Sequence, residues 1–125
     1  MASTEMQAFL EGLQDKPKKK DLGSIEEQRA GTDKFMADQH VPDNVLIDDF
    51  TLANRPARKY FTPGVREDAT LLYLHGGGYS VGSLDSHQSF MANLAVACKT
   101  AVNGLDYRLA PEDPYPAALD DSVAA

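Results

Sequence analysis

Residues 75–83, with the sequence HGGGYSVGS, contain two overlapping motifs that could take part in acyl chemistry. Residues 78–82 match G-x-S-x-G, in which a serine hydroxyl acts as the nucleophile. Residues 75–78 match H-G-G-G, in which backbone N–H groups bind the oxyanion that develops during acyl transfer. The two motifs assign different roles to the same loop, so the first question is whether Ser80 is a nucleophile.

The position of Ser80 argues against a nucleophilic role. A nucleophile elbow places its serine at a sharp turn directly after a strand, whereas Ser80 lies five residues past His75, where the preceding strand is expected to end. Asp85 and His87 follow in the order of a triad, but residues two apart at a helix start do not face each other. We therefore interpret the match at Ser80 as accidental.

The glycines have a positive role in the second motif. Three consecutive residues without side chains, Gly76, Gly77 and Gly78, give the backbone unusual freedom and leave room for a ligand. Successive N–H groups can then converge on one anionic oxygen. The alternative is that the glycines only permit a tight turn between two elements.

A nucleotide-binding loop is a rival interpretation. Gly76, Gly78 and Gly82 follow an apolar stretch, and Asp106 ends the next predicted strand, where a dinucleotide fold places its ribose-binding acid. The third glycine, however, comes one residue late for G-x-G-x-x-G, and the helix starts too far along to meet a pyrophosphate. This spacing makes a nucleotide site the weaker hypothesis.

The composition is that of an ordinary globular domain. The chain has 125 residues, a hydrophobic fraction of 42%, a charged fraction of 25% and a net charge of −7. So acidic a chain is not expected to bind nucleic acid or an anionic membrane surface. The single cysteine, Cys98, is predicted to be a small buried residue. The start of the chain has no pattern of a secretory signal, so we expect a cytoplasmic protein.

The periodicity of the chain predicts alternating helices and strands. Ser24 and Glu27 have the spacing of a capping box, which predicts the start of a helix at Ser24. Pro42 is expected to end this helix. We expect the strand after Pro63 to be covered on both faces, because it is continuously apolar. Ser83 or Asp85 is expected to cap the next helix. The predicted elements are helices over residues 3–14, 24–39, 85–98 and 116–125, a strand hairpin over 45–53 and 55–63, and strands over 69–75 and 100–107.

These elements predict an α/β fold. Residues 69–107 form a strand–loop–helix–strand unit, and such a crossover makes its two strands parallel neighbours. The last strand, around residues 101–106, is expected to lack a neighbour on one side. An open edge of this kind favours association, either between copies of the chain or with a complementary polypeptide.

Two stretches together resemble one family. LLYLHGGGYSVGSLDSH followed by LDYRLAPEDPYPAALDD is similar to the hormone-sensitive-lipase-like esterases, a branch of the α/β-hydrolase fold. The resemblance implies a partial α/β-hydrolase sheet with one crossover helix. It assigns residues 1–44 to N-terminal cap helices. It assigns residues 45–125 to the N-terminal half of the hydrolase domain, truncated before the nucleophile elbow.

The resemblance also implies roles for individual residues. The backbone N–H groups of Gly77 and Gly78 match the oxyanion donors, and His75 matches a histidine that orients the loop and is not the catalytic base. Gly76 completes the motif, and Tyr79 lies beside the acyl site. His87 matches a structural histidine. The positions that match a brace beneath the loop are Asp106, Tyr107, Arg108 and Glu112.

By this resemblance the function is hydrolysis of small carboxylic esters, without a cofactor or metal. The family's Ser-Asp-His triad would lie past residue 125, so we expect the isolated chain to be inactive. The first alternative is a non-catalytic fragment that pairs with a second chain. A nucleotide-binding module is the less favoured alternative.

Overall fold

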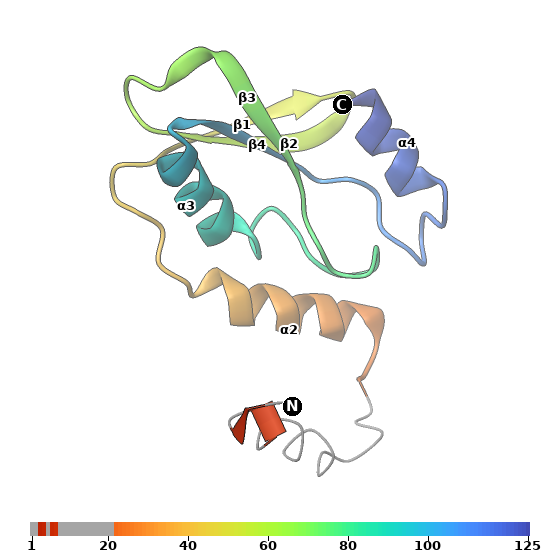
Figure 1. Cartoon of the computed structure of the whole chain (residues 1–125). Coiled ribbons are helices and arrows are strands. Elements are labelled where there is room, and N and C mark those ends of the chain that lie inside the picture. The colour runs from red at the N-terminus through yellow and green to blue at the C-terminus, as the bar shows by residue number, and fades with distance from the viewer. Residues whose placement is uncertain (1–2, 5, 8–21) are drawn as a thin grey trace.

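The computed structural model describes residues 3, 4, 6, 7 and 22–125, which fold into a mixed sheet with helices around it (Figure 1). The predicted helix over residues 3–14 lies for the most part outside the described residues. The elements in chain order are α2 (Ile25–Ala37), β1 (Leu46–Leu52), β2 (Arg55–Phe61), β3 (Arg66–Leu74), α3 (Gln88–Cys98), β4 (Thr100–Leu105) and α4 (Ala117–Ala124).

Strands β1 and β2 form the predicted hairpin. They pair antiparallel, from Leu46 opposite Phe61 to Leu52 opposite Arg55. The connecting residues Ala53 and Asn54 have φ angles of +48° and +63°. Such a two-residue turn with positive φ follows the right-handed twist of the flanking strands. The hairpin prediction is therefore confirmed.

Strands β3 and β4 form the predicted parallel crossover. They pair in parallel, with Leu71 opposite Val102 and Leu74 opposite Leu105, and α3 connects them. The other side of β4 pairs antiparallel with β2. The crossover unit is confirmed, and it places the glycine loop at the carboxyl end of β3.

The strand order corrects the prediction of an open edge at β4. The order in the sheet is β1-β2-β4-β3, so β4 lies inside the sheet and the outer strands are β1 and β3. The sequence gives the order of strands along the chain, whereas the order in the sheet depends on which strand the hairpin approaches. The exposed edge next to the crossover therefore belongs to β3.

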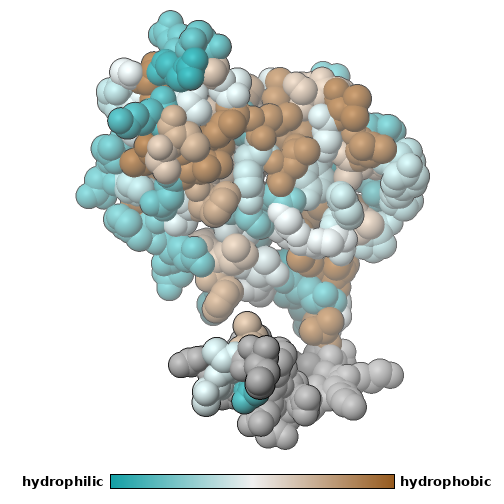
Figure 2. All heavy atoms as spheres, in the orientation of Figure 1, coloured by the Kyte–Doolittle hydropathy of each residue, from teal (hydrophilic) through white to brown (hydrophobic). Residues whose placement is uncertain are grey.

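Strand β3 also differs from the expectation that both of its faces are covered. Leu71, Leu72 and Leu74 are 37%, 42% and 43% exposed. The strand lies at the edge of the sheet, and α3 packs mainly against the inner strands β4 and β2. Figure 2 shows hydrophobic residues at the surface of the part of the molecule that contains the sheet. An apolar run in a sequence indicates a strand, but it does not show whether another element covers it.

The core has one cluster on each face of the sheet. On the first face, one side of α3 packs against the sheet and against Leu84, which precedes the helix. This cluster contains Tyr60, Leu84, Met91, Ala92, Ala95 and Val102. On the second face, α4 and the segment after β4 pack on a smaller cluster, which contains Ala57, Leu105 and Tyr107. These clusters hold the loop end of β3 against β4 and the segment that follows it.

The start of α3 and its last residue differ from the predictions. His87 occupies the N-cap position without a side-chain cap, so Ser83 and Asp85 do not cap the helix. Ser83 and Ser86 instead close a turn, in which the backbone N–H of each donates to the other's Oγ (2.8 and 3.0 Å). Cys98, predicted to be buried, is exposed. None of the described helices or strands covers the Cys98 thiol.

Helix α2 begins as predicted and crosses beneath the glycine loop (Figure 1). The Ser24 hydroxyl accepts from the backbone N–H of Glu27, and the Glu27 carboxylate accepts from the backbone N–H of Ser24. The helix ends at Ala37, before Pro42. No residue of α2 is buried. Apolar burial therefore contributes little to holding α2 in place, and its polar contacts matter more.

The packing of α3 gives a stability prediction. Met91 is fully buried, so Met91→Ala should lower the free energy of unfolding by about 2–5 kcal/mol through lost burial and a residual cavity. Val96 lies on the same helix and is 36% exposed, so Val96→Ala should change it by about 0.5 kcal/mol or less. Denaturant unfolding of both variants measures the difference. Equal losses in the two variants would contradict the packing described for α3.

Candidate active site

The glycine loop after β3 has a run of residues in the left-handed region. Gly77, Gly78 and Tyr79 have φ angles of +135°, +61° and +60°. The backbone N–H groups of Ser80 and Val81 both donate to the carbonyl oxygen of Gly77, at 3.2 and 3.1 Å. The loop is thus a tight turn that reverses directly after the strand.

This geometry requires glycine at positions 77 and 78, but not at position 76. A Cβ on Gly77 would lie 1.9 Å from the carbonyl oxygen of Val81, which is backbone and cannot move aside. Gly78 needs its positive φ angle. A Cβ on Gly76 would meet nothing within 4 Å. The chain therefore offers Gly76 as a matched control for the other two positions.

The backbone N–H groups of Gly77 and Gly78 have no acceptor among the described residues, in contrast to those of Ser80 and Val81. Both glycines line a cavity of about 880 Å³, and an amide that faces a cavity can bind a ligand oxygen. The cavity is lined mainly by apolar and aromatic residues, with a few polar ones, as is usual for small-molecule sites. Its lining includes Leu74, Tyr79, Tyr107, Arg108, Asp113, Tyr115, Leu119 and Ser122.

His75 lies buried behind the loop, with 4% of its surface exposed. Its ring stacks on Tyr107, with ring centroids 4.4 Å apart and planes 15° apart. Tyr107 donates a short hydrogen bond to the backbone carbonyl oxygen of His75, and Nδ1 of His75 lies 3.0 Å from the carbonyl oxygen of Gly76. Nε2 has no partner among the described residues. This geometry fits a residue that fixes the start of the loop.

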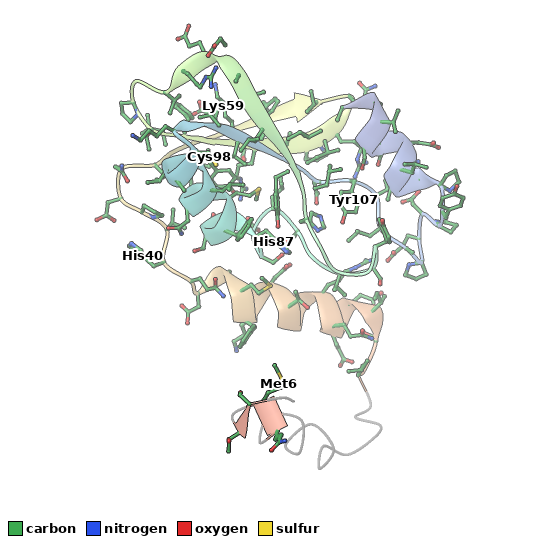
Figure 3. All side chains as sticks on the ribbon, viewed as in Figure 1. Met6, His40, Lys59, His87, Cys98 and Tyr107 are labelled. Carbon is green, nitrogen blue, oxygen red and sulfur yellow. The ribbon has the colours of Figure 1, made fainter. Side chains whose placement is uncertain are left out.

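His87 and Asp106 lie near His75. Figure 3 labels His87, which precedes α3, and Tyr107, which follows β4. The His87 ring is 5.4 Å from the His75 ring, and its Nδ1 is 3.0 Å from the Ser86 hydroxyl. Burial, followed by the proximity of His75, lowers the pKa of His87. Burial raises the pKa of Asp106, whose backbone carbonyl oxygen accepts two hydrogen bonds from Arg55. These contacts fit the structural role expected for His87 and a brace that includes Asp106.

Arg108, expected in the brace beneath the loop, forms an ion pair with Asp121 on α4. Nη2 of Arg108 lies 2.7 Å from Oδ1 of Asp121, and the backbone N–H of Arg108 donates to Oδ2 at 2.9 Å. Arg55 adds a second contact at 3.4 Å. Hydrogen bonding to Arg108 lowers the pKa of Asp121, which is itself buried. The pair fixes α4 against the segment that lines the cavity.

The environment of Ser80 does not provide a base. Its hydroxyl donates to the carbonyl oxygen of Gly78 at 3.2 Å, and no histidine among the described residues forms a hydrogen bond with it. A serine nucleophile needs a base within hydrogen-bond reach. Ser80 is thus a residue of the turn in this geometry.

The sequence analysis missed Arg29, which joins α2 to the glycine loop and to the segment after β4. It donates to the carbonyl oxygens of Ser80 and Ala110, and it pairs with Glu112 at 2.7 Å. Hydrogen bonding to Arg29 lowers the pKa of Glu112 to about 2. Glu112, expected in the brace beneath the loop, therefore pairs with the N-terminal region. No local pattern signals this contact, because the partners are 83 residues apart in the sequence.

In the part of the chain that the structure describes, no group of His, Cys, Asp and Glu side chains could hold a metal ion. No helix there is long and apolar enough to cross a membrane.

Comparisons with known proteins agree with this architecture. A family model described as alpha/beta hydrolase fold matches residues 71–125. Carboxylesterase NlhH of Mycobacterium tuberculosis is 48% identical over 75 residues, which are 59% of this chain and 24% of that protein. The acetyl-hydrolase of Streptomyces hygroscopicus is 46% identical over 67 residues, 54% of this chain and 22% of its own length.

Solved structures match nearly the whole chain. An esterase from the bacterial hormone-sensitive lipase family is 33% identical, with a TM-score of 0.78 over 100% of this chain and 42% of that one. A hormone-sensitive lipase from a metagenome library is 34% identical, with a TM-score of 0.82 over 100% and 41%. The chain thus spans about a quarter of its curated relatives and about two fifths of these structures.

The chain has a partial α/β-hydrolase fold, in which the glycine loop follows the strand at the sheet edge. Over the region that it covers, it is similar to the N-terminal portion of solved esterases of the hormone-sensitive lipase family.

The ion pair between Arg108 and Asp121 predicts a pH-dependent stability. Because the folded state lowers the pKa of Asp121, the pair stabilises the fold above the unfolded carboxyl pKa of about 4, and this contribution is lost as the pH falls through the lower folded value. Asp121→Asn should therefore be less stable than the parent chain at pH 7, and the difference should shrink below about pH 4.

Asp120→Asn is the matched control, since Asp120 is the exposed neighbour on the same helix. Thermal unfolding between pH 2 and pH 7 measures both variants. A stability difference for Asp121→Asn that stays constant down to pH 2 would be inconsistent with an ionised pair.

Proposed function

We propose that this chain supplies the oxyanion-binding loop of a carboxylic-ester hydrolase, with the backbone N–H groups of Gly77 and Gly78 as the donors. The observation that carries the proposal is that these two N–H groups have no acceptor among the described residues while both glycines line the cavity. Two converging donors stabilise the negative charge that develops on a carbonyl oxygen during acyl transfer. The resemblance to esterases supports ester chemistry at this site.

The surroundings of the loop have supporting roles in this proposal. His75 and Tyr107 hold the start of the loop, and Tyr79, 66% exposed, lies beside the space for the acyl group. Leu74, Tyr115 and Leu119 give the cavity apolar walls that suit the acyl or alcohol part of a small ester. In this proposal the oxyanion is bound by backbone N–H groups alone, without a metal or an organic cofactor.

We propose further that the 125-residue chain alone does not turn over esters. Its loop can stabilise an oxyanion, but Ser80 has no histidine partner within the described residues. The relatives are longer than the region that this chain covers. The outer edge of β3 and its exposed leucines are where a complementary polypeptide would add a strand, since an unpaired strand edge is a template for pairing.

A chimera tests the oxyanion role. Joining this chain to the part of carboxylesterase NlhH that it does not cover should give an enzyme that hydrolyses p-nitrophenyl acetate. Gly77→Ala in the chimera should lower kcat by about a hundredfold or more, because the new Cβ displaces the loop from its donor geometry. Gly76→Ala should stay within a few-fold of the parent chimera, because its Cβ meets no atom.

Circular dichroism and thermal unfolding confirm that each chimera is folded before its rate is compared. A folded Gly77→Ala chimera with the parent rate would overturn the oxyanion assignment. Hydrolysis by the 125-residue chain alone, abolished by Ser80→Ala, would instead show that Ser80 is the nucleophile and that the isolated chain is an enzyme.

A further inference from the structure

Helix α2 is attached to the site by a small number of polar contacts, and Arg29 makes most of them. No residue of α2 is buried, whereas the Arg29 side chain is only 25% exposed. The helix therefore depends on directed hydrogen bonds for its position. The targets of those bonds show which part of the molecule α2 can influence.

The guanidinium group of Arg29 bridges the glycine loop and the segment after β4. Nε donates to the carbonyl oxygen of Ser80 at 2.8 Å, and Nη2 donates to that of Ala110 at 2.9 Å. The backbone N–H of Ala110 in turn donates to the carbonyl oxygen of Tyr79 at 2.8 Å. Arg29 thus closes a ring of hydrogen bonds that holds residues 79–80 against Ala110.

Glu112 orients this guanidinium group. Its two carboxylate oxygens accept from Nη1 and Nη2 at 2.8 and 2.7 Å, the paired geometry in which arginine binds a carboxylate most strongly. With both terminal nitrogens fixed by Glu112, Nε points at Ser80. Lysine has a single terminal nitrogen, so it cannot satisfy the three acceptors in the same way.

The segment that Arg29 restrains directly follows the two proposed donors. Tyr79 has a φ angle of +60°, which is uncommon for a residue with a side chain and persists only where the surroundings enforce it. The ring of hydrogen bonds acts on the carbonyl groups of Tyr79 and Ser80. Releasing it would let the backbone from Gly77 onward relax, and the direction of the two N–H groups would change with it.

We propose that Arg29 is a positioning residue for the oxyanion loop, so that docking of α2 and the order of Gly77 and Gly78 are coupled. This inference rests on the function proposed above for the two glycines. Arg29 acts through the backbone of residues 79–80 and has no contact with the reacting atoms in this assignment.

The competing explanation is that Arg29 only anchors α2. The helix has a second attachment to the same region, in which the Ser83 hydroxyl donates to Asp33 at 2.8 Å. Asp33→Ala removes this contact and leaves Arg29 in place. It therefore separates loosening of the helix from loosening of the loop.

Nitrogen-15 relaxation of the full 125-residue chain tests the proposal. In the parent chain the amides of Gly77, Gly78 and Tyr79 should have order parameters near 0.85, the value of rigid backbone. Arg29→Gln should lower them below about 0.6 while the core amides of Ala95 and Val102 stay rigid. Asp33→Ala should leave the loop rigid, as should Lys34→Gln, which removes a positive charge from the same helix.

Unchanged order parameters in the loop of Arg29→Gln would overturn the proposal, and so would an equal loss of order in Asp33→Ala. If Arg29→Gln also loosens Ala95 and Val102, Arg29→Lys decides, because it keeps a positive charge near Glu112. In Arg29→Lys, a disordered loop with a rigid core would support the role of Arg29 as a positioning residue. A fully ordered loop in that variant would overturn this role. The relaxation measurement requires no turnover, so its result is independent of whether the chimera hydrolyses esters.

Discussion

The backbone turn after β3 has positive φ angles at Gly77, Gly78 and Tyr79, and it needs support from its surroundings because Tyr79, unlike the glycines, adopts such an angle only at a cost. Among the described residues, the N–H groups of Gly77 and Gly78 in this turn have no acceptor. Both glycines are exposed, so water or a ligand can satisfy these groups. The rest of the site can be understood as the set of contacts that hold this turn in place.

Those contacts come from three directions. Strand β3 fixes the entry to the loop through its parallel pairing with β4, and the His75–Tyr107 stack reinforces it. The segment after β4 is fixed in turn by the ion pair of Arg108 with Asp121 on α4. Helix α2 contacts the loop through Arg29, which donates to the carbonyl oxygens of Ser80 and Ala110. Each contact is modest, but together they allow the loop to present its amides without rearrangement, which is the physical basis of electrostatic preorganisation.

The parts of this arrangement that follow from neighbouring residues could be predicted from the sequence. The capping box at Ser24 and the hairpin depend on patterns within a few residues, the crossover depends on the order of three consecutive elements, and the H-G-G-G motif indicates its own chemistry. The strand order could not be predicted, because nothing in β4 shows that the hairpin pairs beside it. Arg29 could not be predicted either, since its partners lie 51 to 83 residues away. The exposure of Cys98 depends in the same way on which elements pack nearby.

Amide hydrogen exchange at four positions of the loop tests the central claim most directly, since it reports which N–H groups are hydrogen-bonded. The claim is that Gly77 and Gly78 present free N–H groups while Ser80 and Val81 use theirs to close the turn. We predict exchange close to the intrinsic rate at Gly77 and Gly78 and clearly slower exchange at Ser80 and Val81. Protection at Gly77 and Gly78 equal to that at Ser80 and Val81 would contradict the claim, because those amides would then already have acceptors within the protein.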